Sequence, residues 1–430
     1  MPDTANTDVQ TENPDEKIGT FSSLRIPNFR YLLTGTTLSN AAQWIQQITL
    51  NWLVYDITGS GTMLGTVNLA RSVSAISMIP LAGILIDRLP RRKLLMTNNS
   101  WLFIITAALG VLLLLGYDQI IFIFIFAVLG GFVGTIEGTL RQVLVFDLVP
   151  RRSTPNGMAL IQTGWSLMRS FGPAIGSFLL VSIGAGGNFL VQAAAYALIV
   201  ITIMRIKFPE KKSGIVQNRP LENIKEGLRY VKKERTIRIF MLMGFILPLL
   251  IIPIYTILPP IYAADVFGDP TGRILGFLMA SVGVGGIAGG FVTASLGSME
   301  RRGLLQLGSL LMCAVSLIFF AFSQSLIVSL LFLALSGFFE IIFLTTNQTL
   351  MQLSIPDDLR GRVTSVVNLN MAIMPMGNLV AGIGADLLGG PKWITVVFAG
   401  TAVLVVILVF LFSPTVRNYR LSEGMKKIRG

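Results

Sequence analysis

The sequence contains no histidine and a single cysteine among its 430 residues. Histidine is the usual proton-relay side chain near neutral pH and the commonest metal ligand. A lone cysteine, Cys313, excludes an intrachain disulfide and a cysteine metal cluster. We therefore expect no metal site and no cofactor, and any proton chemistry has to use carboxylates.

Charged residues are also scarce, at 13% of the chain, whereas a soluble protein carries about 25%. Hydrophobic residues make up 53%. Apolar stretches of about 20 residues recur along the chain, which is the length that crosses a bilayer core as a helix. The alternating ten-residue segments of a membrane β-barrel are absent. This composition predicts an all-α polytopic membrane protein.

Twelve apolar segments are long enough to span a membrane, and the basic block at 205–238 divides them six and six. Their approximate limits are 29–55, 62–86, 94–116, 119–142, 157–183, 187–206, 237–262, 272–297, 303–322, 325–350, 361–388 and 392–413. The predicted organisation is a disordered cytoplasmic tail at 1–24, an N-terminal half at 25–206, a linker with an amphipathic helix at 207–236, a C-terminal half at 237–413 and a basic cytoplasmic tail at 414–430.

The lysines and arginines indicate how the chain is oriented. They gather in alternate connections, and the connections on the other side keep only Arg273 and Lys392. The positive-inside rule then predicts that both termini are cytoplasmic. We interpret the net charge of +12 as this topology signal and not as nucleic-acid binding. Only the block at 205–238 is basic enough to contact anionic membrane lipid.

An internal repeat relates the two halves. Residues 129–150 align without gaps with residues 335–356, so that Gly131 matches Gly337 and Pro150 matches Pro356. Many secondary transporters are built from such six-plus-six repeats, with the substrate site between the halves. The repeat disfavours a channel or a membrane enzyme without excluding either.

The connection between the second and third segments carries five charges within seven residues. It resembles the G-x-x-x-D-R-x-G-R-R/K loop of the major facilitator superfamily, with Pro90 at the position of the second glycine. The matching residues are Gly83, Asp87, Arg88, Arg91, Arg92 and Lys93. The resemblance implies that Asp87 and Arg88 are gating residues that steady the outward-facing state. A topology signal alone explains the other three charges equally well.

The resemblance extends over almost the whole chain and is more specific than the superfamily. Residues 28–60, 148–160 and 355–366 resemble a bacterial exporter group that includes the enterobactin exporter and the macrolide-efflux proteins. This implies a twelve-helix major facilitator fold in the bacterial inner membrane, alternating access and a monomer.

The fifth segment carries a second motif. Gly172, Pro173 and Gly176 resemble the core of the superfamily's antiporter motif, although Met168 replaces its first glycine. The resemblance implies a role in coupling. Close helix packing explains the two glycines equally well.

Five ionisable residues fall inside the apolar segments, where charges are costly and usually functional. They are Arg71, Glu137, Arg141, Arg169 and Glu340. Glu137 and Arg141 are four residues apart and share a helix face. We hypothesise that Glu137 takes up a proton during transport. The alternative is a static pair of Glu137 with Arg141 or Arg169. The resemblance implies that both glutamates line a central cavity.

Polar side chains in the first and tenth segments suggest a substrate cavity. Amides and an indole suit a polar organic ligand. The candidates are Gln43, Trp44, Gln46, Asn347 and Gln348. Gln47 and Asn51 are further amides in the first segment. Such amides also hold membrane helices together, so we expect about half of the set to be structural.

Nothing in the sequence indicates an enzyme. No serine, cysteine or histidine arrangement for catalysis and no G-x-x-x-x-G-K-[ST] motif is present. An ion gradient is therefore the expected source of energy. The predicted function is proton-coupled export of a small organic molecule, such as a siderophore or a drug-like compound. The alternatives are uptake of a solute or lipid, and a sensor or interaction protein that no longer transports.

Overall fold

Helices form all the regular secondary structure that the computed structural model describes, which covers residues 22–150, 153–206, 208, 220–296, 299–355 and 359–419. The N-terminal half consists of η1 (Ser22–Arg25), α1 (Pro27–Thr58), α2 (Gly61–Arg88), α3 (Arg91–Leu114), α4 (Ile120–Leu148) and α5 (Thr154–Arg205). The all-α prediction is confirmed.

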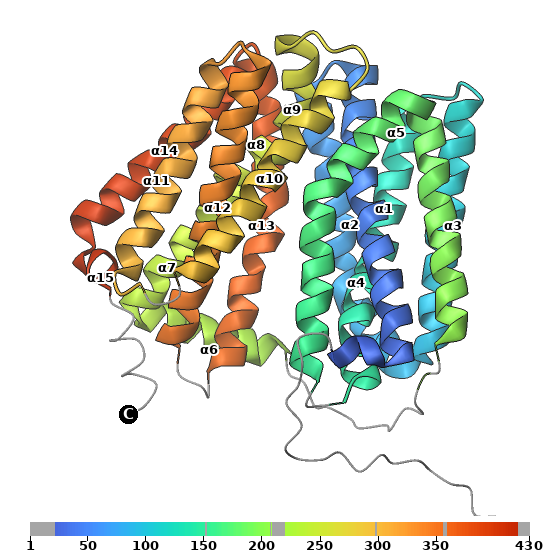
Figure 1. Cartoon of the computed structure of the whole chain (residues 1–430), viewed down its shortest axis with the longest axis horizontal. Helices are drawn as coiled ribbons and strands as arrows, with labels where there is room; N and C mark the ends of the chain where they lie inside the picture. Colours follow the sequence, from blue (N-terminus) through green and yellow to red (C-terminus); the bar gives the residue numbers. More distant parts are fainter. Residues whose placement is uncertain are drawn as a thin grey trace, which may run out of the picture.

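Helix α5 contains two crossings. Its backbone reverses at Gly184, where φ is 70° and ψ is 175°, in a region that only glycine enters at little cost. The two legs run down from this corner on either side of α1 (Figure 1). They correspond to the predicted segments 157–183 and 187–206.

The C-terminal half begins with a broken helix. Its parts are α7 (Arg235–Ile246), η2 (Leu247–Ile251), α8 (Ile252–Thr256), α9 (Leu258–Ile261) and η3 (Tyr262–Val266). Prolines at 248, 253, 259 and 260 remove backbone donors and interrupt the regular ladder. The remaining helices are α10 (Arg273–Ser295), α11 (Arg302–Phe322), α12 (Leu326–Ser354), α13 (Arg360–Leu387), α14 (Pro391–Phe412) and α15 (Pro414–Arg417).

Nine helical stretches among the described residues are long and apolar enough to cross a membrane. One of them is α5, which supplies two crossings. Helices α1 and α13 are less apolar, since α1 carries several amides and α13 contributes only the shorter apolar stretch Ala372–Leu387. With these two helices the described chain is consistent with the twelve predicted crossings.

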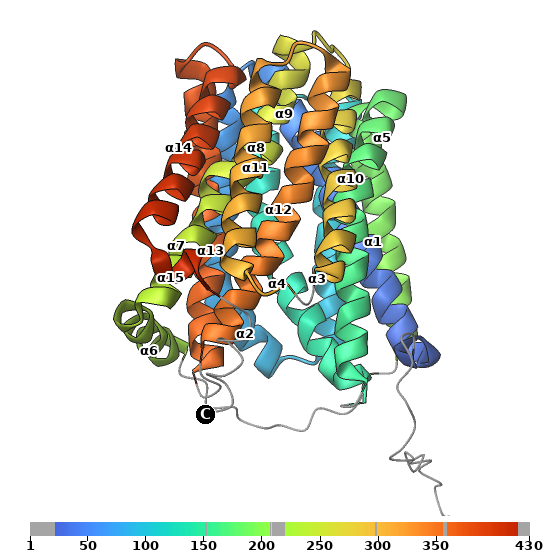
Figure 2. The ribbon, with the colours of Figure 1, turned by 60° about the vertical axis from the view of Figure 1, so that its left-hand side comes forward.

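The two halves stand side by side, and α6 (Pro220–Lys233) lies at one end of the C-terminal half, against α13 and α7 (Figures 1 and 2). We call this the α6 end, and the opposite end, where α9 lies, the α9 end. Helix α1 starts at the α6 end and finishes at the α9 end, so position along α1 gives height in the bundle.

Contacts between the halves gather from mid-height to the α9 end. The Asn51 amide donates to the carbonyl of Thr256 (2.7 Å), and the Tyr55 hydroxyl donates to Asp265 (2.6 Å). The Asp386 carboxylate accepts hydrogen bonds from the first turn of α2. Towards the α6 end of α2, by contrast, a side chain at Gly83 would meet nothing within 4 Å. The described arrangement is therefore closed at the α9 end.

Candidate functional site

A buried ion pair lies in the lower half of α4. Two guanidinium nitrogens of Arg141 donate to the Glu137 Oε1 atom, over 2.7 and 2.9 Å. Glu137 is 0% exposed and Arg141 is 6% exposed. The four-residue spacing places the two side chains on one face of the helix. Of the two partners that the sequence left open for Glu137, the structure shows Arg141.

Helix α1 completes the surroundings of this pair. The Ser39 hydroxyl donates to Glu137 Oε1 over 2.9 Å, and Arg141 donates to the Thr36 hydroxyl over 3.2 Å. The second carboxylate oxygen, Oε2, is buried and has no hydrogen-bond partner among the described residues. One oxygen is thus bound by three donors, and the other is left to accept a proton or a ligand donor.

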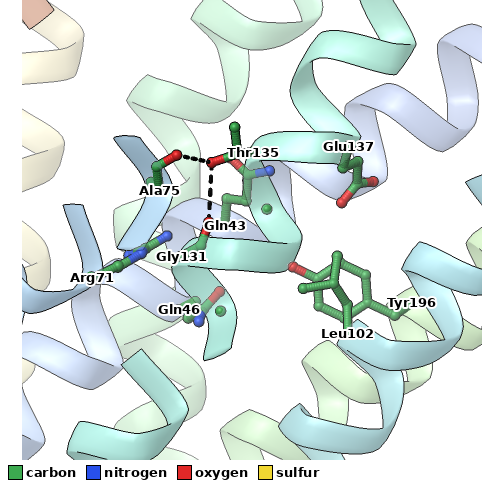
Figure 3. Close-up of a pocket in the computed structure, with 11 residues that line it drawn as sticks. Gln43, Gln46, Arg71, Ala75, Leu102, Gly131, Thr135, Glu137 and Tyr196 are labelled. Carbon is green, nitrogen blue, oxygen red and sulfur yellow. Dashed lines mark hydrogen bonds between the residues drawn. The ribbon is translucent and has the colours of Figure 1, made fainter. Parts of the chain in front are cut away.

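Glu137 also lines a cavity of about 180 Å³. The cavity lies entirely within the N-terminal half, between α1, α2, α3, α4 and the second leg of α5. Its lining residues are Gln43, Gln46, Arg71, Ala75, Leu102, Gly130, Gly131, Gly134, Thr135, Glu137 and Tyr196. Figure 3 shows Arg71 and Glu137 on opposite sides, with the Tyr196 hydroxyl pointing into the space between them.

Arg71 is the positively charged residue among those that line the cavity. Its guanidinium donates to the Gln47 side-chain oxygen over 3.0 Å. No carboxylate of the described residues lies within 4 Å of it. Because unpaired charges are costly at membrane depth, such a residue is a functional candidate.

A chain of amides connects Arg71 to the other half. Gln47 donates to Asn68 (3.1 Å), and Asn68 donates to Asn51 (3.0 Å). Asn51 in turn donates to the Thr256 carbonyl. Sequence reasoning noted Gln47 and Asn51 as polar but did not connect them, because Asn68 belongs to another helix. The chain joins the cavity to the closed α9 end.

A second ion pair connects the halves at mid-height. Arg169 on α5 donates to Glu340 on α12 over 2.6 Å. The Arg169 guanidinium also lies 5.8 Å from the centre of the Trp165 ring, a cation–π distance. Glu340 is 2% exposed and does not line the cavity. The expectation that both glutamates line a central cavity between the halves stays a prediction.

The five predicted cavity residues separate into two groups. Gln43 and Gln46 line the cavity. Trp44 packs edge-on against Trp165, with ring centres 6.3 Å apart. Asn347 accepts a hydrogen bond from Gln306 on α11 (2.6 Å), which holds two helices together, and Gln348 is exposed. Tyr196 is a lining residue that the sequence analysis missed, because one tyrosine in an apolar segment gives no distinguishing signal.

The antiporter-like motif packs α5 against α1. A methyl group at Gly172 would come within 2.6 Å of the Trp44 Cβ atom, and one at Gly176 within 3.1 Å of the Ile45 Cα atom. Pro173 lies between them on the same helix and is buried. This contact is the close approach that small residues permit.

The charged connection between α2 and α3 lies at the α6 end. The Asp87 side chain is outside the described part of the structure. Arg88 is exposed, Arg92 donates to the Met204 carbonyl over 2.9 Å, and Arg91 is half-buried. Among the described residues, no group of three or more His, Cys, Asp or Glu side chains is placed to hold a metal ion.

Two curated relatives cover almost the same length as this chain. The staphyloferrin A transporter of Staphylococcus aureus is 28% identical over 409 residues, which is 92% of this chain and 98% of the relative. The multidrug efflux pump Tap of Mycolicibacterium fortuitum is 25% identical over 369 residues, covering 83% and 89% of the two chains. Both similarities agree with the predicted resemblance to bacterial exporters.

A solved structure has the same fold. It is a bacterial homologue of the human lysosomal transporter Spinster in an inward-facing, unoccupied conformation, with a TM-score of 0.71 and 15% identity, covering 91% of this chain and 98% of that one. The family model described as "Transmembrane secretion effector" matches residues 18–423. The chain therefore belongs to this family of major facilitator transporters and is a multi-pass membrane protein.

Proposed function

We propose that the protein exports a small organic molecule, such as a siderophore or a drug-like compound, in exchange for protons by alternating access. The names of two relatives support these substrate classes, since one is a transporter of the siderophore staphyloferrin A and the other is a multidrug efflux pump. Protons are the proposed coupling ion, and a monomer is the proposed working unit.

Glu137 carries the proposal. Glu137 is one of the residues that line the cavity. Its Oε1 atom is held by Arg141 and Ser39, while its buried Oε2 atom has no partner among the described residues. A proton on this carboxylate removes the charge that holds Arg141. Proton uptake by Glu137 therefore frees Arg141 from its ion pair. A coupled transporter requires such a link between protonation and a change in the contacts of another group.

The charge distribution supports an orientation. Arg25, Arg30 and Arg88 are exposed residues of helices that reach the α6 end, whereas Arg273 and Lys392 follow the connections at the α9 end. With the α6 end in the cytoplasm of a bacterial inner membrane, both termini are cytoplasmic. The described arrangement is then open towards the inside and closed towards the outside.

The gating loop fits the same proposal. In the described arrangement Gly83 has open space around it, while Gly61 and Gly65 at the other end of α2 pack against the α13 backbone near Gly382 and Leu379. The outward-facing state would exchange these contacts for contacts at the α6 end. Gly83, Asp87 and the neighbouring arginines are the residues proposed to form them.

Transport into inverted membrane vesicles tests the proposal. The panel contains siderophores, macrolides and fluorescent cations, each measured with and without a proton gradient. We expect gradient-dependent accumulation of at least one compound, lost when the gradient is collapsed. Absence of accumulation by folded, correctly oriented protein would contradict export of these compound classes.

A matched pair of variants isolates the coupling residue. Glu137→Gln keeps the shape of the side chain but cannot cycle between charged and neutral forms, so we expect accumulation to lose its dependence on the proton gradient. Asp118→Asn changes an exposed carboxylate between α3 and α4 and should leave transport unchanged. Unaltered gradient dependence in Glu137→Gln would refute proton coupling through this residue.

A further inference from the structure

We propose that the cavity binds a carboxylate group of the transported molecule, with Arg71 as the anion-binding residue. The inference rests on the proposed transport function and specifies the chemistry of its substrate. It predicts an acid that carries a hydrogen-bond donor, such as a hydroxyl, next to its carboxylate.

The charge balance of the cavity is the first argument. Its two charged lining residues are Arg71 and Glu137. Arg141 neutralises Glu137 from behind the lining, whereas no described carboxylate is within 4 Å of Arg71. Counted together with Arg141, the charges in and behind the lining sum to +1, and an anionic ligand group would remove the cost of an unpaired cation at membrane depth.

The donors of Arg71 are the second argument. A guanidinium has five N–H groups in a planar fork, which matches a carboxylate in two parallel hydrogen bonds. The described contact of this guanidinium is to Gln47, through one of its nitrogens. Figure 3 shows the nitrogen end of Arg71 directed towards the cavity.

Buried polar groups without partners are the third argument. Gln46 is 5% exposed and Tyr196 is 1% exposed, and neither side chain has a hydrogen-bond partner among the described residues. Because both residues line the cavity, their polar groups are available to a molecule bound there. The amide and the phenol supply donors for the carboxylate, and Glu137, which lines the same cavity, supplies an acceptor for a neighbouring hydroxyl.

The size of the cavity limits what it holds. Its volume of about 180 Å³ is below the roughly 300–1,000 Å³ that drug-sized ligands occupy. A small hydroxy acid fits, as does the acidic end of a longer molecule whose remainder extends towards the other half.

Equilibrium binding of three probes to the purified full chain tests the inference. Malate carries carboxylates and a hydroxyl, succinate lacks the hydroxyl, and succinamide lacks the charge. We expect malate to bind more tightly than succinate and succinamide not to bind. Arg71→Gln should weaken malate binding at least tenfold, and Arg71→Lys should weaken it less because it retains the charge. The control is Arg30→Gln, which removes an exposed arginine of α1.

The outcomes separate this inference from the proposed function. Malate binding that is absent in the wild type, or unchanged in a folded Arg71→Gln variant, overturns the carboxylate site, even if the vesicles accumulate another compound. Malate binding that depends on Arg71 supports the site, even if no panel compound is transported and the export proposal fails.

Discussion

The guanidinium of Arg169 lies 2.6 Å from the carboxylate of Glu340, and this ion pair joins the two halves at mid-height. The other described ion pair within the bundle, Glu137 with Arg141, lies inside one half. Alternating access requires the halves to rotate against each other. A charge contact near the middle of the bundle is the one that such a rotation disturbs least, so this pair can persist while contacts at both ends exchange.

Replacing one member of this ion pair should destabilise the protein more than replacing both members. Glu340→Gln leaves Arg169 as an uncompensated cation, and breaking a buried pair costs about 3–5 kcal/mol. The cost here should be nearer the lower end, because the Arg169 side chain is 23% exposed. The double variant Arg169→Gln/Glu340→Gln leaves no such charge, so its unfolding temperature in detergent should lie closer to the wild type. A double variant less stable than either single variant would contradict this account.

Two neighbouring glycines of α4 should respond oppositely to alanine. A methyl group at Gly131 would collide with the backbone carbonyl of Arg71, whereas one at Gly134 meets nothing within 4 Å. Gly131→Ala should therefore lower the unfolding temperature. Gly134→Ala should raise it or leave it unchanged, since alanine favours a helix over glycine by about 1 kcal/mol. Thermal unfolding of both variants in the same detergent checks the pair, and equal behaviour would argue against the close α2–α4 contact.

The Asp386 carboxylate should hold the α9 end closed. It accepts from the backbone nitrogens of Gly61 (2.7 Å) and Thr62 (2.9 Å) and from the Ser60 hydroxyl (2.8 Å). Hydrogen bonds to a charged group contribute about 1.5–3 kcal/mol, which is a factor of about ten or more in an equilibrium constant. Asp386→Ala should shift the population towards the state that is open at this end.

Cysteine labelling measures that shift. Cys313 is buried, so background labelling is low. A cysteine at Gln46, which is 5% exposed, should react faster with a membrane-impermeant maleimide from the α9 side in the Asp386→Ala background. Asp118→Ala, an exposed position, serves as the control. Equal labelling rates in the two backgrounds would show that Asp386 does not stabilise the closed end.

The antiporter-like motif can be tested for packing against coupling. Gly172→Ala brings a methyl group within 2.6 Å of the Trp44 Cβ atom, so we expect lower thermal stability and a loss of transport in proportion to the loss of folded protein. The measurement is gradient-driven transport per folded molecule. A variant that is as stable as the wild type but no longer depends on the proton gradient would favour coupling instead.

Local patterns predicted the helices and the contacts within one helix. Apolar length predicted the membrane helices, including α1 and α13, which are less apolar than the others. The resemblance to the major facilitator superfamily implied how they are arranged. The spacing of Glu137 and Arg141 placed them on one face because a helix repeats every 3.6 residues. Such reasoning works wherever sequence neighbours are also spatial neighbours.

Contacts between distant segments were not accessible in this way. Arg169 and Glu340 are 171 residues apart, and nothing in either segment specifies the other as its partner. The same applies to Asn347, whose bond to Gln306 depends on the register of α11 against α12. The cavity within one half also escaped prediction, because helical periodicity gives the face of a residue but not which helices surround it.

All the residues that line the cavity belong to the N-terminal half. In a rigid-body rotation of the halves, this cavity keeps its shape in both orientations, so a ligand held only there has the same affinity for each. Such a ligand cannot bias the equilibrium between them, however tightly it binds. Cargo that also reaches the C-terminal half would distinguish the two orientations, whereas a short acid that fills the cavity alone would occupy the place that such cargo needs.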